Sequence, residues 1–210
     1  MQMTKEQVLD WLKALAAEYK VQKEYLTGLD AAIGDADHGI NMDRGFGKVL
    51  EKLPSMEAKD IGAILKDTGM TLLSSVGGAS GPLYGTFFMK AGMALAGAET
   101  LDEAAMQKLL ESGVEGIVSR GRPVEGDKTM YDIWKPALDA YTQAVQAGAA
   151  LDAALDAAVA AAEKGLEATV PMQARKGRAS YLGERSIGHK DPGGASSCMM
   201  LGALRQSIGG

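Results

Sequence analysis

Three aspartates lie close together in the first part of the chain: Asp30, Asp35 and Asp37. The last two belong to the segment Gly34-Asp-Ala-Asp-His-Gly39. Alternate residues of an extended loop point to the same side, so these two carboxylates can converge, and Asp30 can complete the set. Converging carboxylates repel one another. A hard divalent ion such as Mg²⁺ relieves that repulsion, because it binds a few carboxylates together with phosphate oxygens and water.

A second interpretation of this acidic loop stays open. An Asx-rich turn with helix caps uses the same residue types, and its carboxylates are solvated and bind no metal. The spacing alone does not decide between the two. His38, which follows the acidic pair, could act as a base, as a metal ligand or as a neutral hydrogen-bonding group. No cysteine or second histidine lies near it in the sequence, which argues against zinc.

The glycines form a second pattern. Many of the 27 glycines stand where a loop meets a predicted helix, as in Gly77-Gly-Ala-Ser-Gly-Pro82 and Gly188-His-Lys-Asp-Pro-Gly193. Glycine lets another group approach the backbone, and a helix N-terminus offers free N–H groups to a phosphate. Neither a Walker motif nor a dinucleotide fingerprint is present. Glycines that only turn corners between helices remain the alternative.

One segment of this acidic chain, which carries a net charge of −5, is basic. Arg175, Lys176, Arg178 and Arg185 lie within eleven positions of one another, in a stretch without clear periodicity. Such a segment can act as a lid over anionic groups or as a docking loop for an acidic partner. A solvated surface loop is the alternative, although long loops without secondary structure are uncommon unless they are functional or disordered.

Apolar residues at helical spacing predict about eight helices between Thr4 and Ser207. Thr4-Lys-Glu-Gln7 and Thr100-Leu-Asp-Glu103 fit capping boxes. One helix is expected to begin near Asn41 and the last one near Gly193. No alternating β-branched run indicates a strand. We therefore predict an all-α fold in which one domain spans residues 1–210 and antiparallel helices are joined by loops.

Composition excludes several classes of protein. A pI of about 5.1 argues against nucleic-acid binding through a basic face. A single cysteine, Cys198, allows no disulfide within the chain and fits a reducing compartment. The polar N-terminus does not resemble a signal peptide, and no apolar window is long enough to span a bilayer. We expect a cytoplasmic protein that binds neither nucleic acid nor membrane.

Taken together, the motifs closely resemble the nucleotide-binding L subunits of dihydroxyacetone kinases. The resemblance covers essentially the whole chain. It rests on Gly28-Leu-Asp30, Ile33-Gly-Asp-Ala-Asp-His-Gly-Ile-Asn41, Ser74-Ser-Val-Gly-Gly-Ala-Ser-Gly-Pro82, Gly126-Asp-Lys-Thr-Met130 and the stretch from Ala174 to Gly193. Five motifs in matching order are far more specific than any one of them. The family implies a barrel of eight antiparallel amphipathic helices with a nucleotide at one end.

The resemblance also implies the roles of individual residues. Asp30, Asp35 and Asp37 match ligands of two Mg²⁺ ions that bridge the phosphates of ADP or ATP. His38, Gly39, Ile40 and Asn41 are expected to meet the nucleotide at the start of their helix, and Ala79 and Ser80 to hold the phosphates. Gly121 and Met130 match the adenine side. Arg178 and the turn formed by Asp191, Pro192 and Gly193 are expected to close over the nucleotide.

The reaction that the family implies is phosphoryl transfer. In one kind of member, the domain works with a dihydroxyacetone-binding K domain and consumes ATP. In the other, a free L subunit keeps ADP as a coenzyme, which a phosphohistidine carrier of the phosphoenolpyruvate phosphotransferase system recharges. Chain length and detailed similarity to enterobacterial L subunits favour the second kind. An ATP-dependent subunit with exchangeable nucleotide and a non-catalytic helical protein that binds divalent ions are the alternatives.

Overall fold

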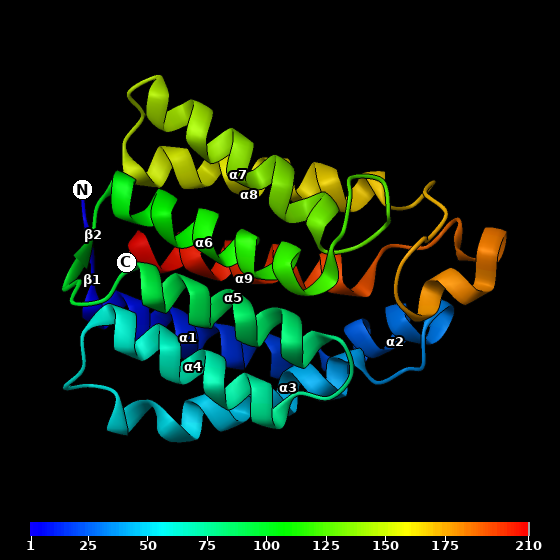
Figure 1. Ribbon diagram of the computed structural model, residues 1–210, viewed down its shortest axis with the longest axis horizontal. Coiled ribbons are helices and arrows are strands. Elements are labelled where there is room, and N and C mark those ends of the chain that lie inside the picture. The colour runs from blue at the N-terminus through cyan, green and yellow to red at the C-terminus, as the bar shows by residue number, and fades with distance from the viewer. Residues whose placement is uncertain (210) are drawn as a thin grey trace.

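The computed structural model describes residues 1–209 and is almost entirely helical (Figure 1). Its elements are β1 (Met3–Thr4), α1 (Lys5–Val21), α2 (Lys23–Ile33), α3 (His38–Lys52), η1 (Leu53–Ser55), α4 (Ile61–Ser75), α5 (Ser80–Ala94), β2 (Thr100–Leu101), α6 (Glu103–Gly121), α7 (Tyr131–Gln146), α8 (Leu151–Ala168), η2 (Arg178–Ser186) and α9 (Pro192–Ile208), where η marks 3-10 helices. The predicted all-α fold is confirmed. The two short strands, which form one antiparallel pair, were not predicted.

Eight of these helices form a closed ring. Around it the order of contacts is α1, α3, α4, α5, α6, α7, α8 and α9, which packs against α1 again. Neighbouring helices run in opposite directions (Figure 1). Four helices, namely α3, α5, α7 and α9, therefore begin at the same end of the ring. The remaining helix, α2, lies at that end and packs against α3, α9 and η2. The paired strands lie at the opposite end.

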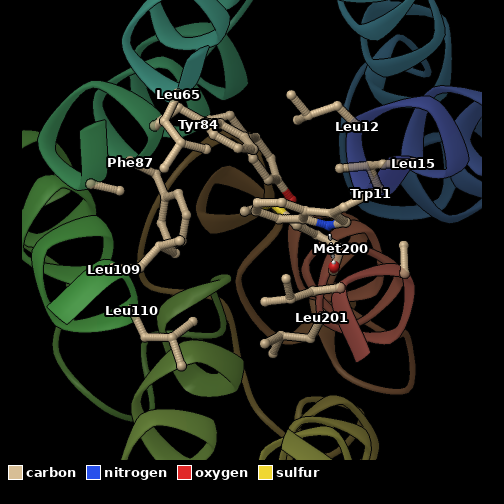
Figure 2. Close-up of a cluster of buried hydrophobic side chains, with 14 of the residues drawn as sticks. Trp11, Leu12, Leu15, Leu65, Tyr84, Phe87, Leu109, Leu110, Met200 and Leu201 are labelled. Atoms are coloured by element: carbon tan, nitrogen blue, oxygen red, sulfur yellow. Dashed lines mark hydrogen bonds between the residues drawn. The ribbon is translucent and has the colours of Figure 1, made fainter. Parts of the chain in front are cut away.

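Most of the aromatic residues are buried inside the ring. Trp11 of α1 lies 5.6 Å from Phe88 of α5, and Phe87 lies 4.7 Å from Trp134 of α7, measured between ring centroids. Figure 2 shows Trp11 among leucines from several helices, with its indole N–H donating to the backbone oxygen of Met200 at 3.1 Å. Burial of these large side chains, together with the aliphatic residues of the core, stabilises the closed ring.

Glycines bring α4 and α5 into backbone contact. A Cβ on Gly92 would lie 2.5 Å from the backbone oxygen of Gly62 and 2.6 Å from the backbone nitrogen of Lys66. About two helical turns further along α4, a Cβ on Gly69 would lie 2.6 Å from the backbone oxygen of Gly85 in α5. Side chains at these positions would push the helices apart, so part of the glycine content serves packing rather than loops.

The ends of the helices agree with the sequence in most places. The capping box at Thr4 is confirmed, because Thr4 and Gln7 exchange side-chain to backbone hydrogen bonds. The box predicted at Thr100 is wrong. Thr100 pairs with Thr4 in the strand pair, and Asp102 caps α6 by accepting from the Ala105 N–H at 2.8 Å. Among residues 1–209, no helix is long and apolar enough to cross a membrane.

Candidate functional site

A cavity of about 280 Å³ opens at the end of the ring where four helices begin. His38, Ser80 and Pro192, the first residues of α3, α5 and α9, line it, as does Met130 immediately before α7. The start of a helix presents unpaired backbone N–H groups and a partial positive charge. Several helix starts around one cavity favour an anionic ligand such as a phosphate.

The three aspartates of the acidic loop meet at this cavity. Asp30, Asp35 and Asp37 each offer a carboxylate oxygen, and these oxygens lie within 4.8 Å of one another. Asp30 is buried at the end of α2, Asp37 is half-buried and Asp35 is exposed. Three hard oxygen donors that converge at an anion-binding cavity fit Mg²⁺.

Asp30 also organises the loop. Its Oδ2 accepts hydrogen bonds from the backbone N–H groups of Asp37 at 2.9 Å and His38 at 3.1 Å, so it caps the start of α3 from outside that helix. Its Oδ1 lies against Gly34, where any Cβ would overlap the carboxylate. Glycine at position 34 therefore leaves room for the Asp30 side chain.

The solvated-turn interpretation accounts for only part of this geometry. Asp37 occupies the cap position of α3, yet its side chain makes no capping hydrogen bond. The carboxylate of Asp37 points to the cavity instead of serving its own helix. In the acidic loop, Asp30 therefore caps α3, and the carboxylate of Asp37 faces the cavity.

The basic segment contributes a cation to the same cavity. The Arg178 guanidinium pairs with the Asp35 carboxylate at 2.8 Å, and both side chains are partly exposed, so the pair adds little stability. Lys176 also lines the cavity and donates to the backbone oxygen of Gly121 at 3.4 Å. The segment from Lys176 to Ala179 thus forms one wall of the cavity.

His38 is buried and fully hydrogen-bonded. Its Nδ1 lies 3.0 Å from Ser80 Oγ, and its Nε2 lies 2.8 Å from Ser196 Oγ. Burial lowers the pKa of the imidazole to about 4, although the charge of Asp30 opposes this shift. The ring is therefore neutral at pH 7, and neither nitrogen is free to bind a metal.

Most of the site residues predicted from the sequence lie around the cavity. Besides the aspartates and His38, the lining includes Ala79, Ser80, Gly121, Met130, Arg178, Asp191, Pro192 and Gly193. Gly39, Ile40 and Asn41 do not line it. Gly39 packs tightly against Lys23 and Thr27 of α2, Ile40 points outward, and Asn41 accepts a hydrogen bond from Arg44 at 2.6 Å.

Lys128 is a cavity residue that the sequence analysis missed. It is 1% exposed, and its ammonium donates to the backbone oxygens of Met172 at 3.1 Å and Ser186 at 2.6 Å. Desolvation lowers its pKa, and the nearby Asp191 opposes this. Lys128 therefore ties both ends of the basic segment to the wall of the cavity. The only signal for it in the sequence was its place in Gly126-Asp-Lys-Thr-Met130.

Asp191 is a further buried charged residue at the cavity, besides Asp30 and Lys128. Its carboxylate caps α9 by accepting from the Gly194 N–H at 2.6 Å. Burial raises its pKa to about 7, while the hydrogen bond from Gly194 and the charge of Lys128 pull the pKa down. Asp191 therefore changes charge near neutral pH.

Comparison with known proteins identifies the family. The model of the DAK2 domain matches residues 32–206. The chain belongs to the DAK2 domain family. The ADP-binding subunit DhaL of the PEP-dependent dihydroxyacetone kinase of Escherichia coli strain K12 is 51% identical to this DAK2 domain over 204 residues, which are 97% of each chain. DhaL of the PTS-dependent dihydroxyacetone kinase of Lactococcus lactis is 40% identical over 98% of this chain and 99% of its own.

A solved structure shares the fold. The dihydroxyacetone kinase of C. freundii in complex with AMP-PNP and Mg²⁺ superimposes on this DAK2 domain with a TM-score of 0.73 and 26% identity. The match covers 99% of this chain and 35% of that kinase. The DAK2 domain thus corresponds to about a third of the longer protein.

Proposed function

We propose that this DAK2 domain is the ADP-binding subunit of a phosphoenolpyruvate-dependent dihydroxyacetone kinase. Bound ADP would accept a phosphoryl group from a phosphohistidine carrier of the phosphotransferase system, and dihydroxyacetone held by a K subunit would receive it. The observation that carries the proposal is the meeting of three carboxylates with four helix starts at one cavity. The similarity to DhaL of E. coli supports it.

The cavity residues divide into three groups in this proposal. Asp30, Asp35 and Asp37 would hold two Mg²⁺ ions, which supply positive charge that offsets the charge of the phosphates. Ala79, Ser80 and the start of α3 at His38 would hold the phosphates. Gly121 and Met130 would lie beside the adenine, with the apolar side chains of Leu83, Ile117 and Pro123 in the same wall.

The chain's own groups then have defined tasks. The N–H groups at the helix starts are fixed by the ring before any ligand arrives, so they stabilise phosphate charge without reorganisation. Arg178 can leave Asp35 and pair with a phosphate when a metal ion neutralises that carboxylate. The turn at Asp191, Pro192 and Gly193 closes the remaining side. No residue of the cavity needs to be phosphorylated, and turnover requires both partner subunits.

Calorimetry tests the binding site. We expect Mg-ADP to bind the wild-type protein tightly and Asp35→Ala and Asp37→Ala to weaken binding by more than tenfold, because each removes a metal ligand. Asp10→Ala is the matched control, since Asp10 is an exposed aspartate of α1 that pairs with Lys13. Equal affinity in all four proteins would mean that the acidic loop binds no metal nucleotide. A wild-type protein that binds Mg²⁺ but no nucleotide, with Mg²⁺ binding lost in Asp35→Ala and Asp37→Ala, would favour the non-catalytic ion-binding protein.

An ATP-dependent subunit with exchangeable nucleotide is the second candidate. The similarity to a C. freundii kinase that was solved with AMP-PNP and Mg²⁺ favours it. The purified chain should be mixed with a K subunit and dihydroxyacetone, first with ATP alone and then with phosphoenolpyruvate and the carrier proteins. Turnover only in the second mixture, with bound ADP that does not exchange with labelled ATP, is the expected result. Rapid exchange and turnover with ATP alone would replace the first proposal by the second.

A further inference from the structure

The His38 ring joins a fully buried hydroxyl to one that faces the cavity. Ser196 Oγ, 2.8 Å from Nε2, belongs to a residue with no exposed surface. Ser80 Oγ, 3.0 Å from Nδ1, belongs to a residue that lines the cavity. Any preference for a hydrogen position on the buried side is therefore passed through the ring to the Ser80 hydroxyl.

The buried side is a small, closed set of hydrogen bonds. Tyr84 Oη lies 2.6 Å from Ser196 Oγ and 3.1 Å from Ser197 Oγ, so Ser196 is its nearer serine partner. Two serine hydroxyls lie near the backbone oxygen of Gly193, with Ser197 at 2.8 Å and Ser196 at 3.0 Å. Tyr19 donates to the backbone oxygen of Ser196 at 2.7 Å. Each hydroxyl has one hydrogen to donate, so few arrangements satisfy the whole set.

A neutral imidazole has one N–H, which leaves two arrangements for the ring. If Nε2 carries the hydrogen, it donates to Ser196, and Ser80 must donate its own hydrogen to Nδ1. Ser80 then shows only lone pairs to the cavity. If Nδ1 carries the hydrogen, it donates to Ser80, and the Ser80 hydrogen is free to donate to a group in the cavity.

The distances favour the second arrangement. Ser197 already donates to the oxygen of Gly193 over the shorter distance, and Tyr84 is well placed to donate to Ser196. The hydrogen of Ser196 then has two acceptors, Nε2 of His38 at 2.8 Å and the Gly193 oxygen at 3.0 Å. Donation to the nearer acceptor leaves Nε2 without a hydrogen and places the ring hydrogen on Nδ1.

We propose that His38 is a positioning residue: the buried Tyr84–Ser196 pair holds its ring hydrogen on Nδ1, so that the Ser80 hydroxyl donates to an anion in the cavity. The ring keeps the same charge throughout, and only the nitrogen that carries the hydrogen is at issue. His38 thus acts through Ser80 and does not touch the ligand with its ring. This inference rests on the proposed function only for the identity of the anion, a nucleoside diphosphate.

The hydrogen position can be observed directly by NMR. The chain has two histidines, His38 and the exposed His189. Protein labelled with ¹⁵N in the imidazole rings therefore gives two sets of signals in a long-range ¹H–¹⁵N correlation spectrum, and His189→Gln assigns them. We expect Nδ1 of His38 to be the protonated nitrogen in the nucleotide-free protein and in the protein saturated with Mg-ADP. A proton on Nε2, or on both nitrogens, in either state would overturn the proposal.

A double-mutant cycle tests whether His38 acts through Ser80. Ser80→Ala should weaken Mg-ADP binding by about 10- to 100-fold, the range for a hydrogen bond to a charged group. His38→Leu should weaken it in the wild-type background and change it less than about threefold in the Ser80→Ala background. His38→Asn, whose amide can donate as Nδ1–H does, should restore affinity to within about threefold of the wild type. Equal losses from His38→Leu in both backgrounds would mean that its role is independent of Ser80.

Two features keep this test separate from that of the proposed function. The NMR experiment on the nucleotide-free protein needs no ligand, so it decides the hydrogen position even if Mg-ADP does not bind. If His38→Leu fails to fold, which its spectrum would show, the NMR result together with His38→Asn still supports or overturns the proposal. A protein with the hydrogen on Nδ1 that binds no Mg-ADP would refute the proposed function and leave this inference standing.

Discussion

At the scale of single residues, the site depends on close contacts that the residue types permit. One carboxylate oxygen of Asp30 accepts hydrogen bonds from two backbone N–H groups, and the other packs against Gly34. These contacts fix the orientation of the carboxylate. Ala36, in the same loop, has a φ of 61°, which is costly for a residue with a side chain. Strained backbone conformations of this kind cluster at ligand-binding sites, so the conformation of Ala36 fits a binding loop.

Gly34→Ala should disturb the acidic loop. Its Cβ would overlap Asp30 Oδ1, so we expect Mg-ADP affinity to fall more than tenfold, and the free energy of unfolding to fall by about 1–3 kcal/mol. Gly28→Ala is the control in α2, because a Cβ there meets open space. It should raise the free energy of unfolding by up to about 1 kcal/mol. Calorimetry and urea unfolding measure both effects, and similar behaviour of the two variants would contradict the assigned role of Gly34.

Asp191 should make stability depend on pH. Its pKa is about 7 in the folded protein and near 3.8 in the unfolded chain, so the folded state binds the extra proton between these values. The free energy of unfolding should therefore fall by a few kcal/mol, about 1.4 kcal/mol per pH unit, as pH rises from 4 to 7. Asp191→Asn keeps a good cap and cannot ionise.

Urea unfolding of the nucleotide-free wild type and of Asp191→Asn at pH 5 and pH 8 checks this expectation. The variant should gain stability relative to the wild type at the higher pH. Comparison of the two proteins also removes the contribution of His38, whose lowered pKa acts in the opposite direction below pH 6.5. A constant difference between the proteins at both pH values would show that Asp191 does not titrate in this range.

At the scale of elements, the ends of the helices were harder to predict from the sequence than their middles. The periodic segments were predictable because apolar spacing is a local property of the sequence. The ends were harder. Thr100 and Asp102 both fit the start of α6, and the strand pair with Thr4 decided in favour of Asp102. Helix α3 begins at His38, three residues earlier than the start expected near Asn41, and Asp30 caps it from another helix.

Arg122→Gly should stabilise the end of α6. Arg122 is exposed and left-handed, with φ 45° and ψ 46°, a conformation that glycine adopts without strain. We expect the free energy of unfolding to rise by about 0.5–1 kcal/mol in urea unfolding. Arg120→Gly, two residues earlier inside the same helix, should lower it by about 1 kcal/mol. Destabilisation by both changes would mean that the conformation at Arg122 carries no strain.

At the scale of the whole molecule, the closed ring creates the cavity. An antiparallel ring places every second helix start at the same end, so α3, α5, α7 and α9 direct their free N–H groups to one place. The same closure brings Ser196 to His38 across 158 positions of sequence. Tight packing between neighbouring helices therefore supports both stability and the shape of the site.

Gly92→Ala should show how far the stability of the ring depends on this packing. Its Cβ would meet backbone atoms of α4, which cannot move as a side chain can, so we expect a loss of about 1–3 kcal/mol or more in the free energy of unfolding. Gly47→Ala, a helical position with open space around it, should instead gain up to about 1 kcal/mol. Thermal and urea unfolding compare the two. Equal stability of both variants would contradict the close approach of α4 and α5.

The sequence by itself determined the helices and the acidic loop. Helical periodicity is read within a few turns, and Asp30, Asp35 and Asp37 are so near in the chain that any compact loop keeps them together. Only the tertiary structure decided which distant residues join them. Arg178 pairs with Asp35, Lys128 is buried under the basic segment, and the Asn41 side chain accepts a hydrogen bond from Arg44. These contacts depend on the order in which helices close the ring, and that order follows from burial of the whole core, which no local pattern specifies.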